Sequence, residues 1–327
     1  MISILLIVLG LALLVLGGEW LVRGASALAL RLGVRPVVIG LTVVAFGTSA
    51  PELVVNLAAA WRGNSEIGFG NVVGSNIGNI GLLLGLTAVL WPLAVHSTIV
   101  VREIPMMVLA ALATVALGAD RWLGGGAPGG PMSDMFTRGE GCMLLLLFGV
   151  FLYYTFTEAL RGRADDALAG ETAEGTVSLP TGRSVLLILG GLACLVGGGQ
   201  ATVLGASRIA QAIGVPDVVI GLTIVAVGTS LPELVTSIVA ARRGAVDVAF
   251  GNIVGSNIFN LLFIYGLTMT IAPAPLPPGG TIDLLVMTGF SAILLPMAIT
   301  GGRSISRLEG GILLALYVAY MAHVVMR

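Results

Sequence analysis

Charge is scarce in this sequence, and lysine is absent from it. Only 10% of the 327 residues are charged and 57% are hydrophobic, whereas soluble domains usually carry about 25% charged residues. Together with a mean hydropathy of +1.03, this composition excludes an ordinary soluble domain. The net charge of −1 offers no basic surface for nucleic acid. The two cysteines lack metal-type spacing, so we expect no cysteine-ligated metal centre and no resident cofactor.

Long apolar runs are abundant, and we count five in each half of the chain. They suit the hydrocarbon core of a bilayer, which is about 30 Å thick. The first run lacks a basic leader and a small-residue cleavage site, so we interpret it as a retained span. The pattern predicts an all-α polytopic protein of the inner (plasma) membrane, with ten transmembrane helices near 2–24, 37–60, 67–91, 99–118, 140–160, 184–211, 217–241, 248–272, 282–300 and 308–326.

An internal repeat organises the chain. The stretch "VVIGLTVVAFGTSAPELV" at 37–54 returns as "VVIGLTIVAVGTSLPELV" at 218–235, and "FGNVVGSNIGN" at 69–79 returns as "FGNIVGSNIFN" at 250–260. The offset is a constant 181 residues, and about 33 of 55 aligned positions are identical. Because five crossings per copy place the copies in opposite orientations, the sequence predicts the inverted-repeat plan of secondary transporters.

The arginines indicate the topology. With ten spans, eleven arginines fall on one side, and the side with both termini holds the other five: Arg62, Arg121, Arg138, Arg208 and Arg327. The positive-inside rule therefore places both termini outside. The predicted organisation is a first five-helix repeat at 1–160, a cytoplasmic linker at 161–183 and a second, inverted repeat at 184–327.

Two glutamates lie in the middle of predicted spans, Glu52 and its repeat mate Glu233. Charged groups at that depth are costly and usually mark a transport pathway. Each follows a proline, Pro51 or Pro232, which removes a helix hydrogen bond and frees backbone carbonyls for a cation. By contrast, we interpret Glu19, near the end of the first span, as interfacial or structural.

Further oxygen ligands accompany each glutamate. Thr48 and Thr229 stand four residues before the glutamates and share their helix faces. In the next helix, amide and hydroxyl side chains recur every four residues: Asn71, Ser75 and Asn79, then Asn252, Ser256 and Asn260. An all-oxygen set with two carboxylates suits Ca²⁺, and Na⁺ can compete for it. Competition for one carboxylate pair is sufficient for antiport.

The residues alone leave alternatives open. Proline kinks and small-residue ridges are common in membrane helices, and Ser or Thr often bonds to its own helix. A cation channel would also line its pore with such ligands. Channels more often build a filter from several subunits, however, whereas this chain contains its own two-fold repeat. A scaffold that transports nothing would need neither glutamate.

The motifs "GTSAPEL" with "GNVVGSNIGN", and "GTSLPEL" with "GNIVGSNIFN", resemble the signature repeats of the cation/Ca²⁺ exchanger superfamily, and most closely those of prokaryotic Na⁺/Ca²⁺ exchangers. The resemblance implies alternating-access antiport of Na⁺ and Ca²⁺ in a lipid bilayer, with no enzymatic activity. We also expect the protein to function as a monomer. The resemblance implies that Glu52 and Glu233 bind Ca²⁺ with the Thr48 and Thr229 carbonyls. It also implies a central layer completed by Asn79 and Asn260, and flanking Na⁺ sites at Ala45, Ser49, Ser75, Ala226, Ser230 and Ser256.

Two departures from relatives bear on the co-transported ion. Asn260 stands where K⁺-dependent exchangers and some microbial relatives carry Asp, which argues against K⁺ co-transport. "GNVVGSN" and "GNIVGSN" also lack the extra acid typical of H⁺/Ca²⁺ relatives, which favours Na⁺ as the counter-ion. An antiporter of H⁺ and Ca²⁺, or of another divalent cation, is the alternative on the same scaffold.

Overall fold

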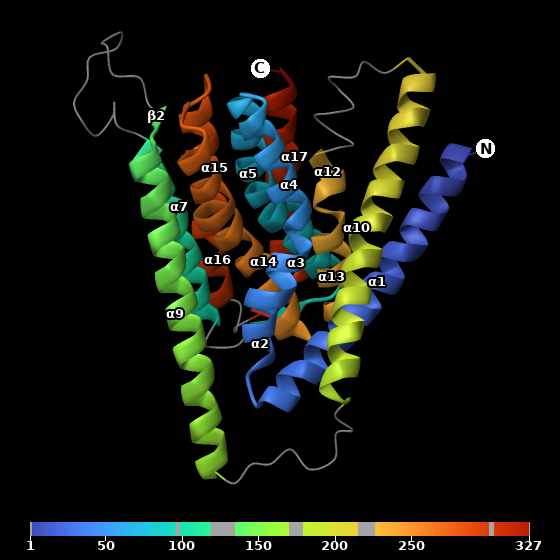
Figure 1. The fold of residues 1–327 in the computed structure, drawn as a ribbon, viewed down its shortest axis with the longest axis vertical. Coiled ribbons are helices and arrows are strands. Elements are labelled where there is room, and N and C mark those ends of the chain that lie inside the picture. The colour runs from blue at the N-terminus through green and yellow to red at the C-terminus, as the bar shows by residue number, and fades with distance from the viewer. Residues whose placement is uncertain are drawn as a thin grey trace. The chain divides into compact units, whose positions relative to one another are not determined.

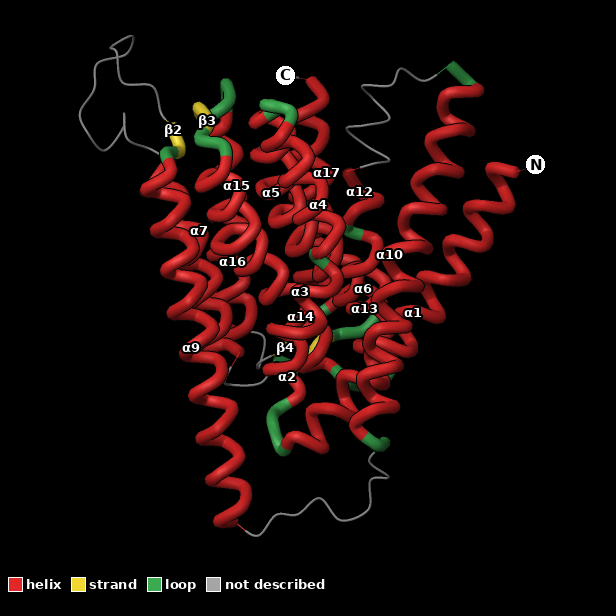
Figure 2. The backbone as a smooth tube through the Cα atoms, viewed as in Figure 1, coloured by secondary structure: helices red, strands yellow, loops and turns green. Residues whose placement is uncertain are grey.

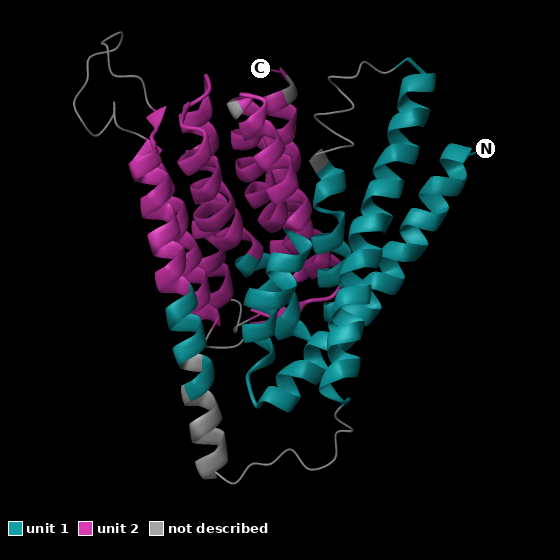
Figure 3. Cartoon of the chain, in the orientation of Figure 1, with its two compact units in different colours: residues 1–49, 152–255 teal, residues 50–151, 256–327 magenta. Residues whose placement is uncertain are grey.

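The computed structural model of the chain describes residues 2–95, 99–118, 135–169, 179–214, 226–300 and 304–326. These residues are overwhelmingly helical (Figures 1 and 2). They form two compact units, one of residues 1–49 and 152–255 and the other of residues 50–151 and 256–327 (Figure 3). Each unit therefore takes segments from both halves of the sequence, so the sequence repeat is not itself a unit of packing.

Most predicted spans coincide with observed helices, but the helix predicted at 2–24 continues to Leu32. Seven described helices are long and apolar enough to cross a membrane, or eight if the helices flanking Ser49 form one broken span. The seven are Ile2–Leu32, Glu66–Leu90, Ile99–Gly118, Arg138–Thr157, Thr181–Ala212, Val246–Ile271 and Gly280–Ile299. The predicted span at 217–241 begins among residues outside the described ranges, and that at 308–326 corresponds to α17 (Arg307–Met326).

The first unit is built on two long helices, α1 (Ile2–Leu32) and α10 (Thr181–Ala212), with α13 (Leu231–Arg242) against them. Shorter elements complete it: α2 (Pro36–Ile39), the π-helical turn η1 (Gly40–Val44), α3 (Ala45–Thr48), α12 (Ala226–Thr229) and most of α14 (Val246–Ile258). Its core consists of apolar side chains that include Leu14, Leu21, Ile188, Leu195 and Val239.

Glycines let α1 and α10 approach closely in an antiparallel pair. A Cβ added to Gly10 would lie 2.7 Å from the carbonyl oxygen of Gly198, and one added to Gly17 would lie 2.7 Å from that of Gly191. The reverse distances are similar. A Cβ added to Gly198 would lie 2.7 Å from the Gly10 oxygen, and one added to Gly191 would lie 2.8 Å from the Gly17 oxygen. Small residues at helix contacts replace the hydrophobic driving force that is missing between helices in lipid.

The second unit contains the other described helices. They are α4 (Ala50–Trp61), α5 (Ser65–Gly78), α6 (Gly85–Leu90), α7 (Ile104–Gly118), the first part of α9 (Arg138–Ala169), α15 (Gly266–Ile271), α16 (Gly280–Thr300) and α17. In the described residues, the π-helical turns η2 (Asn79–Leu84) and η5 (Phe259–Tyr265) lie within spans of this unit, and η3 (Ile99–Glu103) begins another.

Two short antiparallel bridges add strands to the predicted all-α fold. β1 (Leu93–Ala94) pairs with β4 (Ser304–Ile305), and β2 (Met135–Phe136) pairs with β3 (Ala274–Pro275). Each bridge joins one segment from each half of the sequence. The loops between spans thus satisfy part of their backbone hydrogen bonding across the repeat.

Helices α9 and α17 begin in the same way. Thr137 and Glu140 form a capping box at α9, with the Thr137 amide donating to Glu140 Oε2 at 2.5 Å. Ser306 and Glu309 form the equivalent box at α17, with the Ser306 amide donating to Glu309 Oε2 at 2.8 Å. Reciprocal bonds of this kind satisfy helix N-terminal donors.

Each of these helices also packs through a glycine against a helix of the other half of the sequence. Helix α17 packs against α6, and α9 packs against α15. A Cβ on Gly310 of α17 would lie 2.7 Å from the Gly85 oxygen of α6, and one on Gly141 of α9 would lie 2.8 Å from the Gly266 oxygen of α15. Gly85 and Gly266 are repeat mates, 181 residues apart. The correspondence between the halves therefore extends to the last helix of each.

The connection between the two halves is shorter than the linker predicted at 161–183. Helix α9 continues to Ala169, and α10 already begins at Thr181. The sequence "RGRADDALA" is polar but rich in Ala, Arg and Leu, which are good helix formers. Loss of hydrophobicity marks the end of a span, and it did not mark the end of this helix.

We expect the glycine contact between α1 and α10 to be sensitive to a single methyl group. Gly17→Ala should destabilise the protein by roughly 1–3 kcal/mol, because the two nearest atoms, Gly191 O and Leu195 N, are backbone atoms that cannot move aside. Gly197→Ala is the matched control, since a Cβ there meets no atom within 4 Å and alanine favours the helix. Thermal unfolding in detergent should show a lower Tm only for Gly17→Ala, and equal Tm values would contradict the packing described.

Candidate cation site

Both signature motifs contain a helix break at the same position. Helix α3 ends at Thr48 and α4 begins at Ala50, with Ser49 between them at φ −81° and ψ 7°. In the second copy, Ser230 lies between α12 and α13 at φ −88° and ψ 4°. A proline follows two residues later in each case, at the start of the next helix, where its missing N–H is not needed. The interruption predicted from the prolines is therefore present twice.

Glu233 lies at the centre of a hydrogen-bond network in the first unit. Its side chain is buried, with 1% of its surface exposed, and Ser49 Oγ donates to Glu233 Oε1 at 3.0 Å. Asn252 Nδ2 donates to the Glu233 backbone oxygen at 3.3 Å and to Ser237 Oγ at 3.0 Å. Thr48 Oγ1 donates to Asn252 Oδ1 at 2.9 Å. Among the residues that the structure describes, Glu233 Oε2 accepts no hydrogen bond.

Glu52 has a related environment in the second unit. Its side chain is also 1% exposed, and its backbone oxygen accepts hydrogen bonds from Asn56 Nδ2 at 3.0 Å and Asn71 Nδ2 at 3.3 Å. The contact of Asn71 with Glu52 matches that of Asn252 with Glu233, because both pairs are 19 residues apart and both distances are 3.3 Å. In each motif, the equivalent asparagine thus donates a hydrogen bond to the backbone oxygen of the glutamate.

The second motif ends at Asn79 and Asn260, where the helices change their hydrogen-bonding pattern. Asn79 begins the π-helical turn η2, and Asn260 is the second residue of η5. Such turns inside α-helices occur frequently at functional sites. Both side chains are buried, and within the described ranges the Oδ1 atoms of both accept no hydrogen bond. Asn79 Nδ2 donates to Asn257 Oδ1 at 2.9 Å.

The four serines among the predicted ligands are buried as well. Ser49, Ser75, Ser230 and Ser256 all have little exposed surface, and Ser256 Oγ makes no hydrogen bond to any described residue. The Ala45 oxygen accepts from the Ser49 amide at 3.0 Å and from Thr48 Oγ1 at 3.3 Å.

Thr229 is the last residue of α12 and Ala226 is the first, and the Ala226 side chain lies outside the described part of the chain. The predicted ligands divide between the two units: Ala45, Thr48, Ser49, Ala226, Thr229, Ser230 and Glu233 belong to the first, and Glu52, Ser75, Asn79, Ser256 and Asn260 to the second.

The donor chemistry of both groups is restricted to oxygen. No cluster of three or more His, Cys, Asp or Glu side chains occurs in the described residues. Buried carboxylate, amide and hydroxyl oxygens instead suit a hard cation.

Sequence reasoning missed three residues of these networks: Asn56 in the first copy, and Ser237 and Asn257 in the second. Asn76 and Asn257 belong to the repeated "GSN" of the motif. Their identity in both copies was a usable signal, but a ligand pattern of every fourth residue passes over them.

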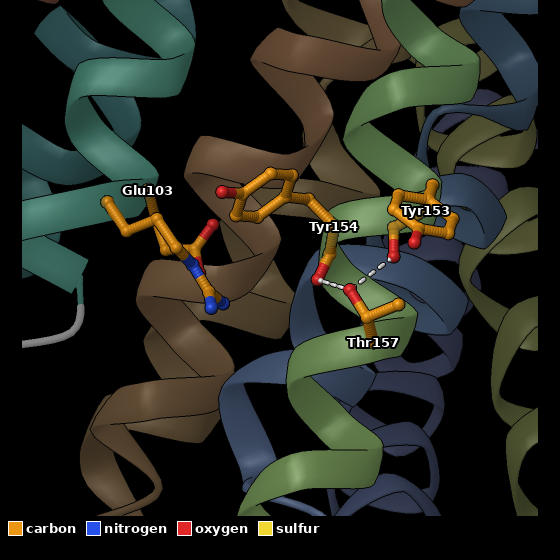
Figure 4. Close-up of polar contacts among 5 residues, drawn as sticks. Glu103, Tyr153, Tyr154 and Thr157 are labelled. Carbon is orange, nitrogen blue, oxygen red and sulfur yellow. Dashed lines mark hydrogen bonds and ion pairs between the residues drawn. The ribbon is translucent and has the colours of Figure 1, made fainter.

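Other polar contacts lie outside these networks. Glu19 forms an ion pair with Arg243, as expected for a structural or interfacial group. Glu103, also drawn in Figure 4, is buried and accepts from Arg102 Nη2 at 2.5 Å. In the same figure, Thr157 Oγ1 donates to the backbone oxygens of Tyr153 at 2.8 Å and Tyr154 at 3.1 Å. The Thr157 bonds run within one helix, and the Glu103 pair joins adjacent residues.

Comparison with known proteins gives the family. The sequence matches the sodium/calcium exchanger protein family over residues 2–157 and 183–326. The sodium/calcium exchanger MaX1 of Methanosarcina acetivorans is 35% identical, over 98% of this chain and 97% of that protein. The inner membrane protein YrbG of Escherichia coli (strain K12) is 34% identical, over 96% of each chain.

A solved structure agrees in fold. The sodium-calcium exchanger NCX_Mj, soaked with 2.5 mM Na⁺ and 0.1 mM Ca²⁺, has a TM-score of 0.82 and 31% identity over 98% of each chain. The protein is thus a multi-pass, helical membrane protein and a transporter rather than an enzyme. It belongs to the sodium/calcium exchanger family.

Proposed function

We propose that this protein exchanges Na⁺ for Ca²⁺ across the membrane by alternating access, with the ions bound at the midplane between Glu52 and Glu233. The observation that carries the proposal is the repeated motif geometry. In each half, a buried glutamate follows a helix break, and an asparagine 19 residues later donates to its backbone oxygen at 3.3 Å. A buried carboxylate of this kind is costly unless a cation compensates it.

The charge and donor type of the two motifs support Ca²⁺ and Na⁺ as cargo. Two carboxylates neutralise one Ca²⁺, which limits the cost of removing all three charges from water. Glu233 Oε2, Asn79 Oδ1 and Asn260 Oδ1 are buried oxygens that accept no hydrogen bond from described residues, as expected of cation ligands. The relatives MaX1 and NCX_Mj, both called sodium/calcium exchangers, support the same ions.

The proposed ligands follow from the motifs. Glu52 and Glu233 bind Ca²⁺ together with the carbonyl oxygens of Thr48 and Thr229, and Asn79 and Asn260 complete this central layer. Flanking Na⁺ sites use the remaining oxygen donors: Ala45, Ser49 and Ser75, and Ala226, Ser230 and Ser256. Since one carboxylate pair serves both ions, binding of Na⁺ displaces Ca²⁺, which is the requirement for antiport.

We also propose ten transmembrane helices in two inverted five-helix repeats, at 1–160 and 184–327, joined by a cytoplasmic connection. Support comes from the reciprocal contacts of the second unit, where α17 packs on α6 and α9 on α15 through equivalent glycines. Both bridges, β1 with β4 and β2 with β3, likewise join the two halves. The arginine distribution supports termini on the outer side, and YrbG, named an inner membrane protein, supports the same membrane.

The counter-ion is tested by transport. Purified protein in liposomes loaded with Na⁺ should take up ⁴⁵Ca²⁺ when the outside lacks Na⁺, and uptake should stop when the Na⁺ gradient is removed at constant pH. Liposomes without protein provide the baseline. Uptake driven by a pH gradient and indifferent to Na⁺ would identify an H⁺/Ca²⁺ antiporter, and Ca²⁺ flux that needs no counter-ion would identify a channel.

The glutamates are tested by neutral, isosteric variants. Glu52→Gln and Glu233→Gln should each weaken Ca²⁺ binding at least about 100-fold and abolish exchange, because a lost charge partner at a buried site costs about 3 kcal/mol or more. Glu140→Gln is the control, since glutamine preserves the capping box at α9. All three variants should elute as folded protein in size-exclusion chromatography. Full exchange by either site variant would refute the ligand assignment.

The topology is tested by reporter fusions in a bacterial inner membrane. Alkaline phosphatase, which is active only outside the cytoplasm, should be active when fused after residue 326. The same enzyme inserted between residues 170 and 178 should be inactive, because that segment connects the two repeats on the cytoplasmic side. The opposite pattern would reverse the proposed orientation.

A further inference from the structure

Asn257 stands beside the predicted ligands without being one of them. It lies in α14, three residues before Asn260, and its side chain is fully buried. Its Oδ1 accepts a hydrogen bond from Asn79 Nδ2 at 2.9 Å. Its own Nδ2 donates to the Asn76 backbone oxygen and to Met107 Sδ, both at 3.4 Å. The side chain therefore connects a proposed ligand to groups that bind no ion.

These partners determine which end of each amide faces which way. A backbone carbonyl and a thioether sulfur can only accept hydrogen bonds, so the end of Asn257 that meets Asn76 and Met107 is its NH₂ group. The opposite end, Oδ1, then faces Asn79 and requires a donor. The NH₂ of Asn79 meets this requirement, which turns the Asn79 carbonyl oxygen away from Asn257. That oxygen is the one that accepts no hydrogen bond from the described residues.

We propose that Asn257 is a positioning residue that fixes the Asn79 amide with its carbonyl oxygen toward the cation; this inference rests on the proposed function. An amide presents a partial negative charge at oxygen and a partial positive charge at NH₂. The two orientations therefore differ in sign toward a bound Ca²⁺. Without a fixed acceptor at Asn257, the Asn79 amide can rotate and lose its preference for presenting oxygen.

The repeat mate of Asn257 has a different role. Asn76 Nδ2 donates to the Val72 oxygen of its own helix at 2.7 Å, and Asn76 Oδ1 accepts no hydrogen bond from any described residue. Asn76 is as fully buried as Asn257. It thus offers a matched control in which a buried asparagine is removed from the same motif without removing a partner of Asn79.

The test measures Ca²⁺ binding to the purified full-length protein in detergent by isothermal titration calorimetry. Asn257→Leu keeps the approximate volume but removes the acceptor, and should raise the Ca²⁺ dissociation constant about tenfold. Asn76→Leu should leave the dissociation constant within about twofold of the unaltered protein. Asn257→Ser, a smaller polar variant that cannot reach Asn79, should behave as Asn257→Leu does and serves if the leucine variant fails to fold.

A double-mutant cycle separates positioning from general packing. If Asn257 acts through Asn79, the variant that combines Asn79→Ala with Asn257→Leu should bind Ca²⁺ no more weakly than Asn79→Ala alone. Multiplied effects, or unchanged affinity in both Asn257 variants, would overturn the positioning role. In that event, Ca²⁺ binding and Na⁺-driven uptake by the unaltered protein would leave the proposed function standing. Absence of Ca²⁺ binding by the unaltered protein would overturn both.

Discussion

Burial of a carboxylate in an apolar span is the constraint from which the rest of the site follows. Water would stabilise that charge, and hydrocarbon does not. The chain surrounds each glutamate with polar groups instead. A helix break precedes each one, and an asparagine donates a hydrogen bond to its backbone oxygen at 3.3 Å. For Glu233, Ser49 Oγ also donates to the carboxylate itself. In the proposed function, a bound cation supplies the remaining compensation for the two buried charges.

Backbone irregularity at this depth has the same origin. The chain leaves the α-helix at Ser49 and Ser230, and changes to π-helical turns at Asn79 and Phe259. Each departure exposes backbone groups that lipid cannot satisfy, so such departures are tolerated only inside the protein. The side chains of these four residues are buried, as this rule requires. The regular, glycine-lined pair of α1 and α10 shows the contrasting case, in which unbroken helices pack by close backbone approach.

Much of this could be predicted from the sequence because membrane helices are read from hydropathy, and because a repeat of 181 residues leaves a direct trace. The span at 99–118 was predicted to the residue. The end of α9 was not, since helix propensity carried it past the apolar run to Ala169. The bridges β1–β4 and β2–β3 were missed as well, because two-residue strands have no periodicity to detect. For the site, the motif gave the residue types, but it could not say whether Asn71 bonds a side chain or a backbone oxygen.

Identical residues in the two copies do not have identical surroundings, so the repeat alone does not determine the hydrogen bonds that they make. Asn71 and Asn252 make the same contact, whereas Asn76 bonds to its own helix and Asn257 bonds to Asn79. Asn56, which bonds the Glu52 oxygen, corresponds to Ser237, which accepts from Asn252. A hydrogen-bond network depends on every partner, so one changed neighbour redirects an unchanged side chain. The repeat therefore specifies which atoms are available in each half, and the neighbours decide which of them are left to face a cation.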